Sequence, residues 1–488
     1  MNASRAAPAS FRDQVRSAVI WRSGTQIFGQ LVAWTSTFLV IRILAPADYG
    51  LYAMSAVVLS LLNLMNGYGL ANALIQQREV TPRLLRQLFG MLIVLNGALA
   101  LLQFAAAPWI ADYYDQPIVA QMLRWQALIF LTNPFLALGY AILSRGMDFR
   151  RQAQVNIVSA LIGAAASLGG ALGGLGVWTL VVAPIAMFGS RALGMALAAR
   201  VLIWPSFDFR GAWGIAGFGG MVALSQLLYF VQTQSDVVIA GRALDPHALG
   251  LYTTALFLAQ IFVNKVVPPL NEVAFSAYAR VQDDPAAMAA GFLKSVRVIL
   301  LLAVPFCLGL ATTAQPLVRV VLGEKWTEAA PLLALLALAM PFMTLHVLFA
   351  PATNAVGRPG IATRTAALGA VVMGLAFVGG VGWGASGIAA AWLAGYPALT
   401  AITAAWSLPA IGVRPRELGR AILPPALAGV AMAMVVMLAD RLAGGLPALP
   451  RLALLVGCGG VVYLGWMTTF AQPRMAEMLA MLRRSAPG

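Results

Sequence analysis

The sequence predicts an all-α integral membrane protein with about 14 transmembrane helices. Two six-helix lobes, related as parallel repeats around a central cavity, would be followed by two C-terminal helices. Three observations predict this class: an apolar composition, a long series of apolar runs, and a phrase that recurs after 200 residues.

The composition is too apolar for a water-soluble protein. Of the 488 residues, 60% are hydrophobic and only 10% are charged, and the mean hydropathy is +0.82. Soluble domains are about half apolar and about 25% charged. A bilayer core about 30 Å thick needs roughly 20 helical residues to cross it, and apolar runs of this length recur throughout the chain.

Hydropathy, together with the Pro, Gly and charged residues between apolar runs, predicts fourteen spans. They lie near residues 19–41, 48–74, 87–110, 119–143, 153–175, 177–199, 215–240, 248–272, 293–315, 329–350, 362–383, 385–407, 421–440 and 450–470. The longest gap, around "AFSAYARVQDDPAAM", leaves no room for a soluble domain. Any function must therefore reside in the spans or in short loops.

The net charge of +15 is explained by membrane topology. With a cytoplasmic N-terminus, 24 of the 32 Lys and Arg residues fall inside, six fall outside and two, Arg124 and Lys265, lie within spans. Cytoplasmic loops carry such an excess of basic residues. Both termini are therefore predicted to be cytoplasmic, and no nucleic-acid partner is expected.

The repeated phrase predicts two similarly built lobes. "RILAPADYGLY" at 42–52 and "RALDPHALGLY" at 242–252 share six of eleven residues. Six predicted spans separate them, so both copies face the same compartment and the repeat is parallel, with its axis along the membrane normal. The predicted organisation is an N-lobe at 1–208, a C-lobe at 209–412, and helices 13 and 14 with a cytoplasmic tail at 413–488.

Several longer phrases resemble a known family. They are "LAPADYGLYAM", "GYGLANALIQQREVT", "APWIADYY", "LSRGMDFRRQA", "GVWTLV", "QTQSDVVIAGRALDPHALGLYTTA" and "VLGEKWTEAAPLL". Over roughly residues 17–410 the chain is similar to bacterial oligosaccharide-lipid flippases, which handle O-antigen and exopolysaccharide repeat units within the multidrug/oligosaccharidyl-lipid/polysaccharide exporter superfamily.

This resemblance implies a transporter and no enzyme. It would sit in the bacterial inner membrane and flip undecaprenyl-diphosphate-linked oligosaccharide repeat units from the cytoplasmic to the periplasmic leaflet, by alternating access, for lipopolysaccharide or exopolysaccharide biosynthesis. The implied partners are the lipid-linked oligosaccharide, membrane lipids, and polysaccharide polymerase or export proteins.

Charged side chains inside spans are candidates for function, because each costs about 2.5–3.5 kcal/mol on insertion scales. Arg22, Arg124 and Lys265 are predicted to bind the substrate's diphosphate or acidic sugars. Asp236 and Glu272 are predicted to couple transport to an ion gradient. Lys265 and Glu272 are seven residues apart, which places them on one face of a continuous helix.

Polar residues form one stripe on each of two corresponding spans. In the seventh span the stripe comprises Ser225, Tyr229, Gln232 and Asp236, and in the first it comprises Ser23, Gln26, Gln30 and Thr37. A wettable face on an otherwise apolar helix indicates a cavity. Gln26, Gln30, Tyr229 and Gln232 are therefore predicted to bind sugar hydroxyls or water.

Each charged candidate also has a local alternative. These are snorkelling of Arg22 to the cytoplasmic interface, and ion pairs of Arg124 with Asp112 or Asp115, of Lys265 with Glu272, and of Asp236 with Arg242. His247 and His346 have no second ligand at metal-binding spacing, and Cys307 and Cys458 lie in apolar spans. No metal and no cofactor are predicted.

Two other functions remain open on the sequence alone. A multidrug or cation exporter of the same fold would favour acidic residues in its cavity, whereas the candidates here are mostly basic. A membrane polysaccharide polymerase would act on the same lipid-linked sugars but would need a substantial outer loop. The duplicated lobes favour a moving carrier.

Overall fold

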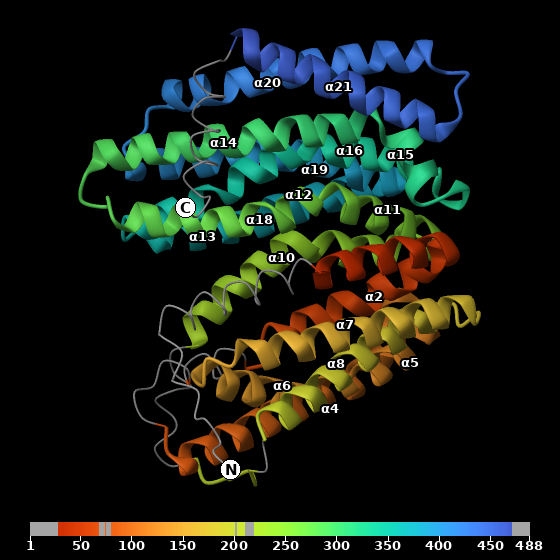
Figure 1. Cartoon of the computed structure of the whole chain (residues 1–488), viewed down its shortest axis with the longest axis vertical. Helices are drawn as coiled ribbons and strands as arrows, with labels where there is room; N and C mark the ends of the chain where they lie inside the picture. Colours follow the sequence, from red (N-terminus) through yellow and green to blue (C-terminus); the bar gives the residue numbers. More distant parts are fainter. Residues whose placement is uncertain (1–27, 68–73, 75–79, 201–202, 210–218, 471–488) are drawn as a thin grey trace, which may run out of the picture. The chain divides into compact units, whose positions relative to one another are not determined.

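The computed structural model describes residues 28–67, 74, 80–200, 203–209 and 219–470, and every regular element in these ranges is a helix. The predicted all-α class is confirmed for this part of the chain. By compactness the chain forms two units, Met1–Leu227 and Leu228–Gly488 (Figure 1). Because the division falls inside helix α10, the lobe boundaries at residues 208 and 412 stay predictions.

The described part of the first unit consists of helices. They are the helix Phe28–Ile43, α2 (Pro46–Asn63), α4 (Pro82–Tyr114), α5 (Pro117–Gln126), α6 (Leu128–Arg145), α7 (Phe149–Leu172) and α8 (Trp178–Ala198). Helix α8 packs against α6 and α7. A Cβ on Gly139 would lie 2.8 Å from the carbonyl oxygen of Met195, and one on Gly194 would lie 2.8 Å from Val155, so glycines allow this close packing.

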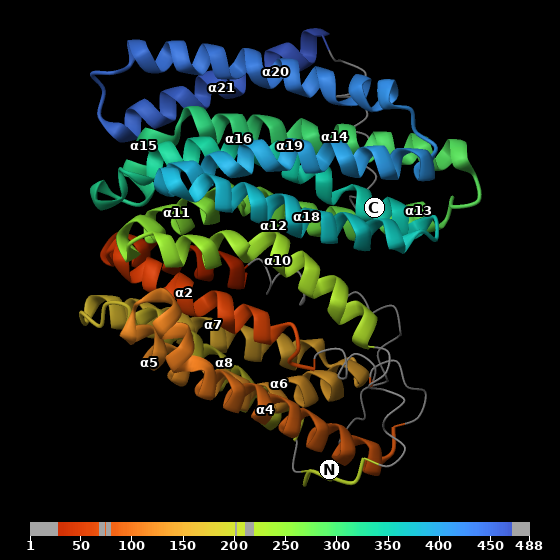
Figure 2. The same ribbon diagram turned by 180° about the vertical axis from the view of Figure 1, so that it is seen from behind.

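The second unit begins within α10 (Gly219–Ala243) and holds the remaining helices. They are α11 (Pro246–Ala259), α12 (Ile261–Lys265), α13 (Val267–Ala279), α14 (Pro285–Thr312), α15 (Ala314–Val321), η1 (Glu324–Trp326), α16 (Ala329–Val347), α17 (Phe349–Ala355), α18 (Pro359–Gly380), η2 (Val381–Trp383), α19 (Gly384–Ile411), α20 (Pro415–Leu442) and α21 (Ala448–Phe470). Figure 2 shows α20 and α21 running side by side next to α14.

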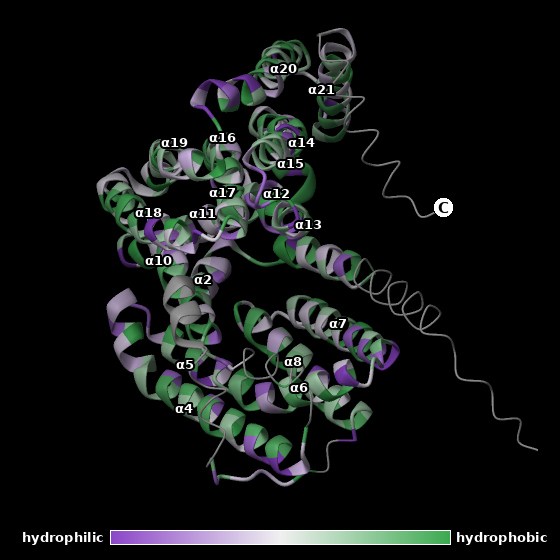
Figure 3. Cartoon of the chain, turned by 90° about the vertical axis from the view of Figure 1, so that its left-hand side faces the viewer, coloured by the Kyte–Doolittle hydropathy of each residue, from purple (hydrophilic) through white to green (hydrophobic). Residues whose placement is uncertain are grey.

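All fourteen predicted spans overlap a helix or a run of consecutive helices. Within the described residues, nine helical segments are long and apolar enough to cross a membrane, so the chain is a multi-pass membrane protein. Figure 3 shows hydrophobic residues along most of these helices. The four predicted spans outside those nine segments are the first two of each half, where the predicted polar stripes and the repeated phrase lie.

One predicted span is not a continuous helix. The range 248–272 is divided into α11, α12 and α13, with interruptions at Gln260 and Val266. Pro268 and Pro269 follow the second interruption. Proline lacks the backbone N–H that a helix interior requires, and its ring clashes with the preceding turn. The prediction that one continuous helix places Lys265 and Glu272 on the same face was therefore wrong.

The two copies of the repeated phrase adopt the same backbone corner. In the first copy a helix ends at Ile43, and the next helix begins three residues later at Pro46. In the second copy a helix ends at Ala243, and the next begins three residues later at Pro246. Each proline occupies the first helical turn, where its missing N–H would have no helical partner anyway. The sequence repeat therefore encodes a structural repeat.

In each copy an aspartate caps the start of the helix that follows the corner. The aspartate of the first copy lies within that helix, whereas the aspartate of the second copy precedes it. In the first copy Asp48, in the first turn of α2, accepts a hydrogen bond at 3.0 Å from the backbone N–H of Ala45. In the second copy Asp245 precedes α11 and accepts at 2.7 Å from the N–H of Ala248. Carboxylates also interact favourably with the helix dipole at this end.

Replacing Asp245 by Ala removes the cap of α11, and we expect the free energy of unfolding to fall by about 1 kcal/mol. Thermal unfolding in detergent micelles, followed by circular dichroism, measures the change. Asp245→Asn keeps an acceptor oxygen and should stay near wild type. Asp283→Ala removes an exposed aspartate next to the capping Asp284 and serves as the control. An equal loss in that control would contradict the capping role.

Candidate functional site

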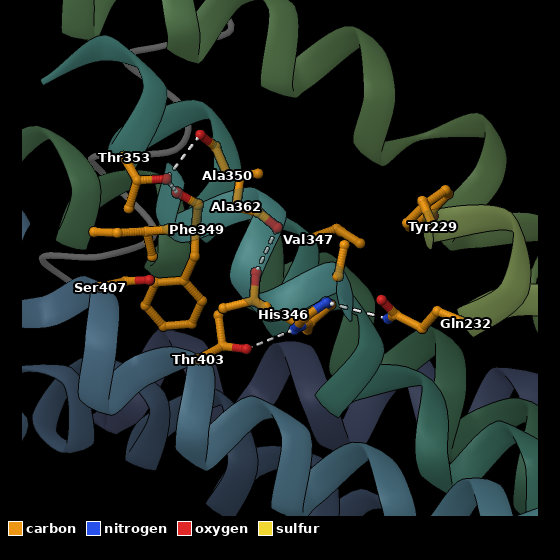
Figure 4. Close-up of a pocket in the computed structure, with 13 residues that line it drawn as sticks. Tyr229, Gln232, His346, Val347, Phe349, Ala350, Thr353, Ala362, Thr403 and Ser407 are labelled. Carbon is orange, nitrogen blue, oxygen red and sulfur yellow. Dashed lines mark hydrogen bonds between the residues drawn. The ribbon is translucent and has the colours of Figure 1, made fainter. Parts of the chain in front are cut away.

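The second unit contains a cavity of about 200 Å³ between α10, α16, α17, α18 and α19 (Figure 4). Its thirteen lining residues are Tyr229, Gln232, His346, Val347, Phe349, Ala350, Thr353, Ile361, Ala362, Thr365, Ala366, Thr403 and Ser407. None of them is an acid, a lysine or an arginine. The pocket therefore combines polar and apolar side chains and has no formal charge apart from the titratable imidazole.

His346 connects two helices across the pocket wall. Its Nδ1 lies 3.1 Å from Oγ1 of Thr403 on α19, and its Nε2 lies 3.4 Å from Nε2 of Gln232 on α10. Each ring nitrogen of His346 therefore has one polar partner, Thr403 at Nδ1 and Gln232 at Nε2. The three side chains are buried.

A second buried chain of hydrogen bonds begins one turn further along α10. The hydroxyl of Tyr252 on α11 donates to Oδ2 of Asp236 at 2.6 Å. The indole N–H of Trp392 on α19 donates to the same hydroxyl oxygen at 2.7 Å. Asp236, Tyr252 and Trp392 are each 0% exposed. A buried carboxylate needs such donors to offset the loss of its hydration.

Aromatic rings join the two chains of hydrogen bonds. The rings of Trp392 and Tyr396, one turn apart on α19, stack with centroids 5.2 Å apart and planes inclined by 11°. Tyr396 in turn meets the His346 ring edge to face at 6.0 Å. Such arrangements stabilise a packed core and fix ring orientations. The imidazole is therefore positioned by packing as well as by hydrogen bonds.

Gly369 on α18 gives Gln232 the space it occupies. A Cβ at residue 369 would lie 2.4 Å from the side-chain oxygen of Gln232. That oxygen has no hydrogen-bond partner among the described residues. The side chain of Gln232 is thus held between Gly369 and His346.

Three residues predicted from the seventh span lie in this region. Tyr229 and Gln232 line the pocket, and Asp236 lies one turn beyond Gln232 on the same helix. The alternative pairing of Asp236 with Arg242 was wrong, because Tyr252 is the hydrogen-bond donor to its carboxylate.

Lys265 and Glu272 are not brought together. Lys265 is the last residue of α12, Glu272 lies in α13, and both are exposed. Within the described ranges neither forms an ion pair, so the alternative of a Lys265–Glu272 bridge was wrong. Their predicted roles in substrate binding and ion coupling stay predictions.

The predicted residues of the first unit have varied surroundings. Arg124 on α5 is exposed, and its guanidinium carbon lies 5.3 Å from the centre of the Phe104 ring. It forms no ion pair with Asp112 or Asp115, both in the described part of the chain, so that alternative was wrong. Gln30 is half-buried on the helix Phe28–Ile43. Arg22 and Gln26 lie outside the described residues.

Sequence reasoning missed most of the residues that complete the site. His346 was considered only as a metal ligand, although a histidine in an apolar span is itself a signal. Tyr252 was noticed only as part of the repeated phrase. Thr403, Ser407 and Trp392 gave no signal, because a helix as apolar as α19 does not reveal which face is buried.

A further cation was also missed in the first unit. Arg191 lies on α8, seven residues from its end at Ala198, and is half-buried. Its Nε donates at 3.1 Å to the hydroxyl of Ser159 on α7, and its guanidinium lies 5.9 Å from the Phe188 ring centre.

In the part of the chain that the structure describes, nine helical segments long and apolar enough to cross a membrane define a helical multi-pass membrane protein of two compact units. A family model described as polysaccharide biosynthesis protein matches residues 39–331, which are 293 of the 488 residues. The chain belongs to this polysaccharide biosynthesis protein family.

Two relatives illustrate the range of the family. The succinoglycan biosynthesis transport protein ExoT of Rhizobium meliloti (strain 1021) is 26% identical over 473 residues, which cover 96% of this chain and 95% of that protein. The lipopolysaccharide biosynthesis protein WzxC of Escherichia coli (strain K12) is 23% identical over 330 residues, covering 67% of this chain and 67% of that protein.

Solved structures share the fold. The lipid II flippase MurJ in its inward closed conformation superposes with a TM-score of 0.75 at 13% identity, covering 94% of this chain and 100% of that one. An inward-facing multidrug resistance MATE family transporter gives a TM-score of 0.62 at 14% identity, covering 83% and 99%. At these identities the likeness concerns the fold alone.

Tyr252→Phe should destabilise the second unit by about 1–3 kcal/mol, because it leaves buried Asp236 and Trp392 without their shared partner. The shift of the thermal unfolding midpoint in micelles measures this loss. Tyr140→Phe, in the first unit, removes a half-buried hydroxyl for which the structure gives no hydrogen bond and should leave the midpoint unchanged. Equal shifts of the unfolding midpoint in both variants would contradict a stabilising role for the hydrogen bonds that join Asp236, Tyr252 and Trp392.

Gly369→Ala should displace Gln232 and cost about 1–3 kcal/mol, because the added methyl would overlap its side chain. Gly374→Ala is the matched control on the same helix, since a Cβ there meets nothing within 4 Å. The double variant Gly369→Ala with Gln232→Ala, in which the crowded side chain is shortened, should recover part of the loss in the unfolding midpoint. Equal unfolding midpoints for Gly369→Ala and Gly374→Ala would disprove the close contact between residue 369 and Gln232.

Proposed function

We propose that this protein flips undecaprenyl-diphosphate-linked oligosaccharide repeat units across the membrane for polysaccharide biosynthesis. The observation that carries the proposal is membership of the polysaccharide biosynthesis protein family, together with a fold of two helical units. ExoT is a transport protein of succinoglycan biosynthesis, and MurJ is a lipid II flippase of similar fold. The protein would act as a transporter, without forming covalent bonds to its substrate.

The proposed setting is the bacterial inner membrane with both termini in the cytoplasm. The excess of Lys and Arg on the predicted inner loops supports this orientation. Transport would then run from the cytoplasmic to the periplasmic leaflet, by alternating access of a site to the two sides. Polysaccharide polymerase or export proteins would receive the product.

Cations would hold the anionic part of the substrate. The diphosphate must leave water while its lipid tail stays in hydrocarbon, and Lys or Arg side chains offset the cost of removing that charge from water. We assign this role to Arg22, Arg124 and Lys265. The exposed positions of Arg124 and Lys265 support it, because side chains already engaged in buried ion pairs could not bind a moving ligand.

Uncharged polar side chains would contact the glycan. Gln26 and Gln30 in the first span, and Tyr229 and Gln232 in α10, offer amide and hydroxyl groups suited to sugar hydroxyls. The location of Tyr229 and Gln232 on the pocket wall supports this assignment.

Asp236 would couple transport to a proton or Na⁺ gradient, with Glu272 as a second acidic candidate. One carboxylate oxygen of Asp236 accepts from Tyr252, whereas Oδ1 has no partner among the described residues. A buried carboxylate with one open oxygen is chemically suited to bind a proton or a monovalent cation. A cation or drug exporter of the same fold is less well supported, because the pocket contains no acid.

A strain lacking this gene should accumulate lipid-linked repeat units on the cytoplasmic side and should fail to export polymer. Mass spectrometry of extracted lipids and quantification of surface polysaccharide measure both effects. Restoring the full-length chain should reverse them. If the deletion strain does not accumulate lipid-linked repeat units, the proposal that they are the substrate is wrong.

In the restored strain, Lys265→Ala should reduce polymer export about tenfold or more, because each charge-assisted hydrogen bond contributes about 1.5–3 kcal/mol. Lys265→Arg should keep much of the export. Arg416→Ala, an exposed basic residue in the first turn of α20, should leave export unchanged when protein levels are matched. Export at wild-type level in Lys265→Ala would exclude the diphosphate role.

A further inference from the structure

We propose that the pocket between α10 and α16–α19 is a subsite for one uncharged sugar ring of the transported glycan. This inference rests on the proposed function and adds which part of the substrate the second unit recognises. It also adds His346, Thr403 and Ser407 as residues that determine which sugar is accepted. Tyr229 and Gln232 then form the part of the subsite that α10 provides (Figure 4).

The size of the cavity suits a single ring. Its volume is about 200 Å³. A cavity of about 150 Å³ is known to accept benzene, a six-membered ring without substituents. A substituted six-membered ring therefore fits here.

The chemistry of the lining selects a neutral, hydroxylated ligand. Seven of the thirteen residues carry hydroxyl, amide or imidazole groups, and the rest are apolar. Phe349, Val347 and Ile361 provide apolar surface for the C–H face of a ring, and the polar groups set its orientation. A sugar carboxylate or phosphate would find no Lys or Arg on this wall, so acidic sugars are excluded.

Ser407 is the strongest indication of a ligand. Its hydroxyl is buried, lines the pocket, and has no hydrogen-bond partner among the described residues. Thr353 and Thr365, in contrast, already donate to carbonyl groups of their own helices. A buried hydroxyl without a partner costs free energy, and a sugar hydroxyl in the pocket would satisfy it.

His346 positions the polar side chains of the subsite on which its selectivity depends. Since Nδ1 has Thr403 and Nε2 has Gln232 as its hydrogen-bond partner, the protein already fixes the orientation of the ring. Thr403 and Ser407 are four residues apart on α19 and face the same pocket. A sugar whose hydroxyls match these fixed groups is bound, and one that leaves a buried group unpaired is rejected.

The test measures binding to the purified full-length protein in lipid nanodiscs. The probes are undecaprenyl diphosphate without sugar, and the same lipid carrying glucose, galactose, N-acetylglucosamine or glucuronic acid. We expect at least one neutral sugar to bind more tightly than the bare lipid, and glucuronic acid to gain nothing. If no neutral sugar adds affinity, the subsite is disproved.

Two variants separate the subsite from the rest of the site. Ser407→Ala removes no hydrogen bond within the protein, so its unfolding midpoint should not fall, while affinity for the preferred sugar lipid should drop about fivefold. Ala366→Leu fills the pocket and should abolish the additional binding affinity that the sugar gives to the lipid. Ser386→Ala on α19 and Gly374→Leu on α18 are the controls outside the pocket. Both pocket variants should bind the bare lipid as wild type does.

Competition with free sugar shows whether the pocket holds the sugar of the lipid-linked glycan. Free glucose or the preferred sugar should displace the sugar lipid from the wild-type protein and should lose this effect in Ala366→Leu. Binding of free sugar without displacement would show a separate site and overturn the assignment to the lipid-linked glycan. If the deletion strain accumulates lipid-linked units but the pocket variants bind like wild type, flipping stands and the subsite fails.

Discussion

The structure depends on one constraint: a polar group buried in an apolar helical protein must find its partner within the protein. The carboxylate of Asp236 is 0% exposed and is held by Tyr252, which is in turn held by Trp392. Removing a charge or hydroxyl from water without such partners costs several kcal/mol. Helices α10, α11 and α19 are therefore joined by polar contacts as well as by packing, and the neighbouring pocket is built against this fixed framework.

The repeated corner and the buried chain belong to the same stretch of the molecule. Tyr252 closes the second copy of the phrase, and Pro246 starts the helix that carries it. The corner sets where α11 begins, and so determines that Tyr252 reaches Asp236 on the preceding helix. The first copy has Tyr52 at the corresponding position but Ser36 where the second has Asp236. The two halves thus share a backbone plan, whereas the buried carboxylate is particular to the second.

A transporter of lipid-linked glycans has to accommodate a diphosphate, sugars and a polyisoprenyl tail in different surroundings. Under the proposed function, the exposed cations on α5 and α12 would hold the diphosphate, and the uncharged pocket would hold a sugar. The apolar outer faces of α20 and α21 suit contact with acyl chains. Such a division would let the carrier lipid be bound by charge while hydrogen bonding distinguishes one sugar from another.

The sequence alone determined the class of protein, the approximate positions of its helices and the repeated corner, because hydropathy and proline placement act locally. It also identified Tyr229, Gln232 and Asp236, since polar residues in an apolar helix are conspicuous. Only the tertiary structure revealed the interruption at Val266, which separates Lys265 from Glu272, and the partners His346, Thr403 and Ser407. Which faces of equally apolar helices meet depends on packing between distant segments, and hydropathy carries no information about that choice.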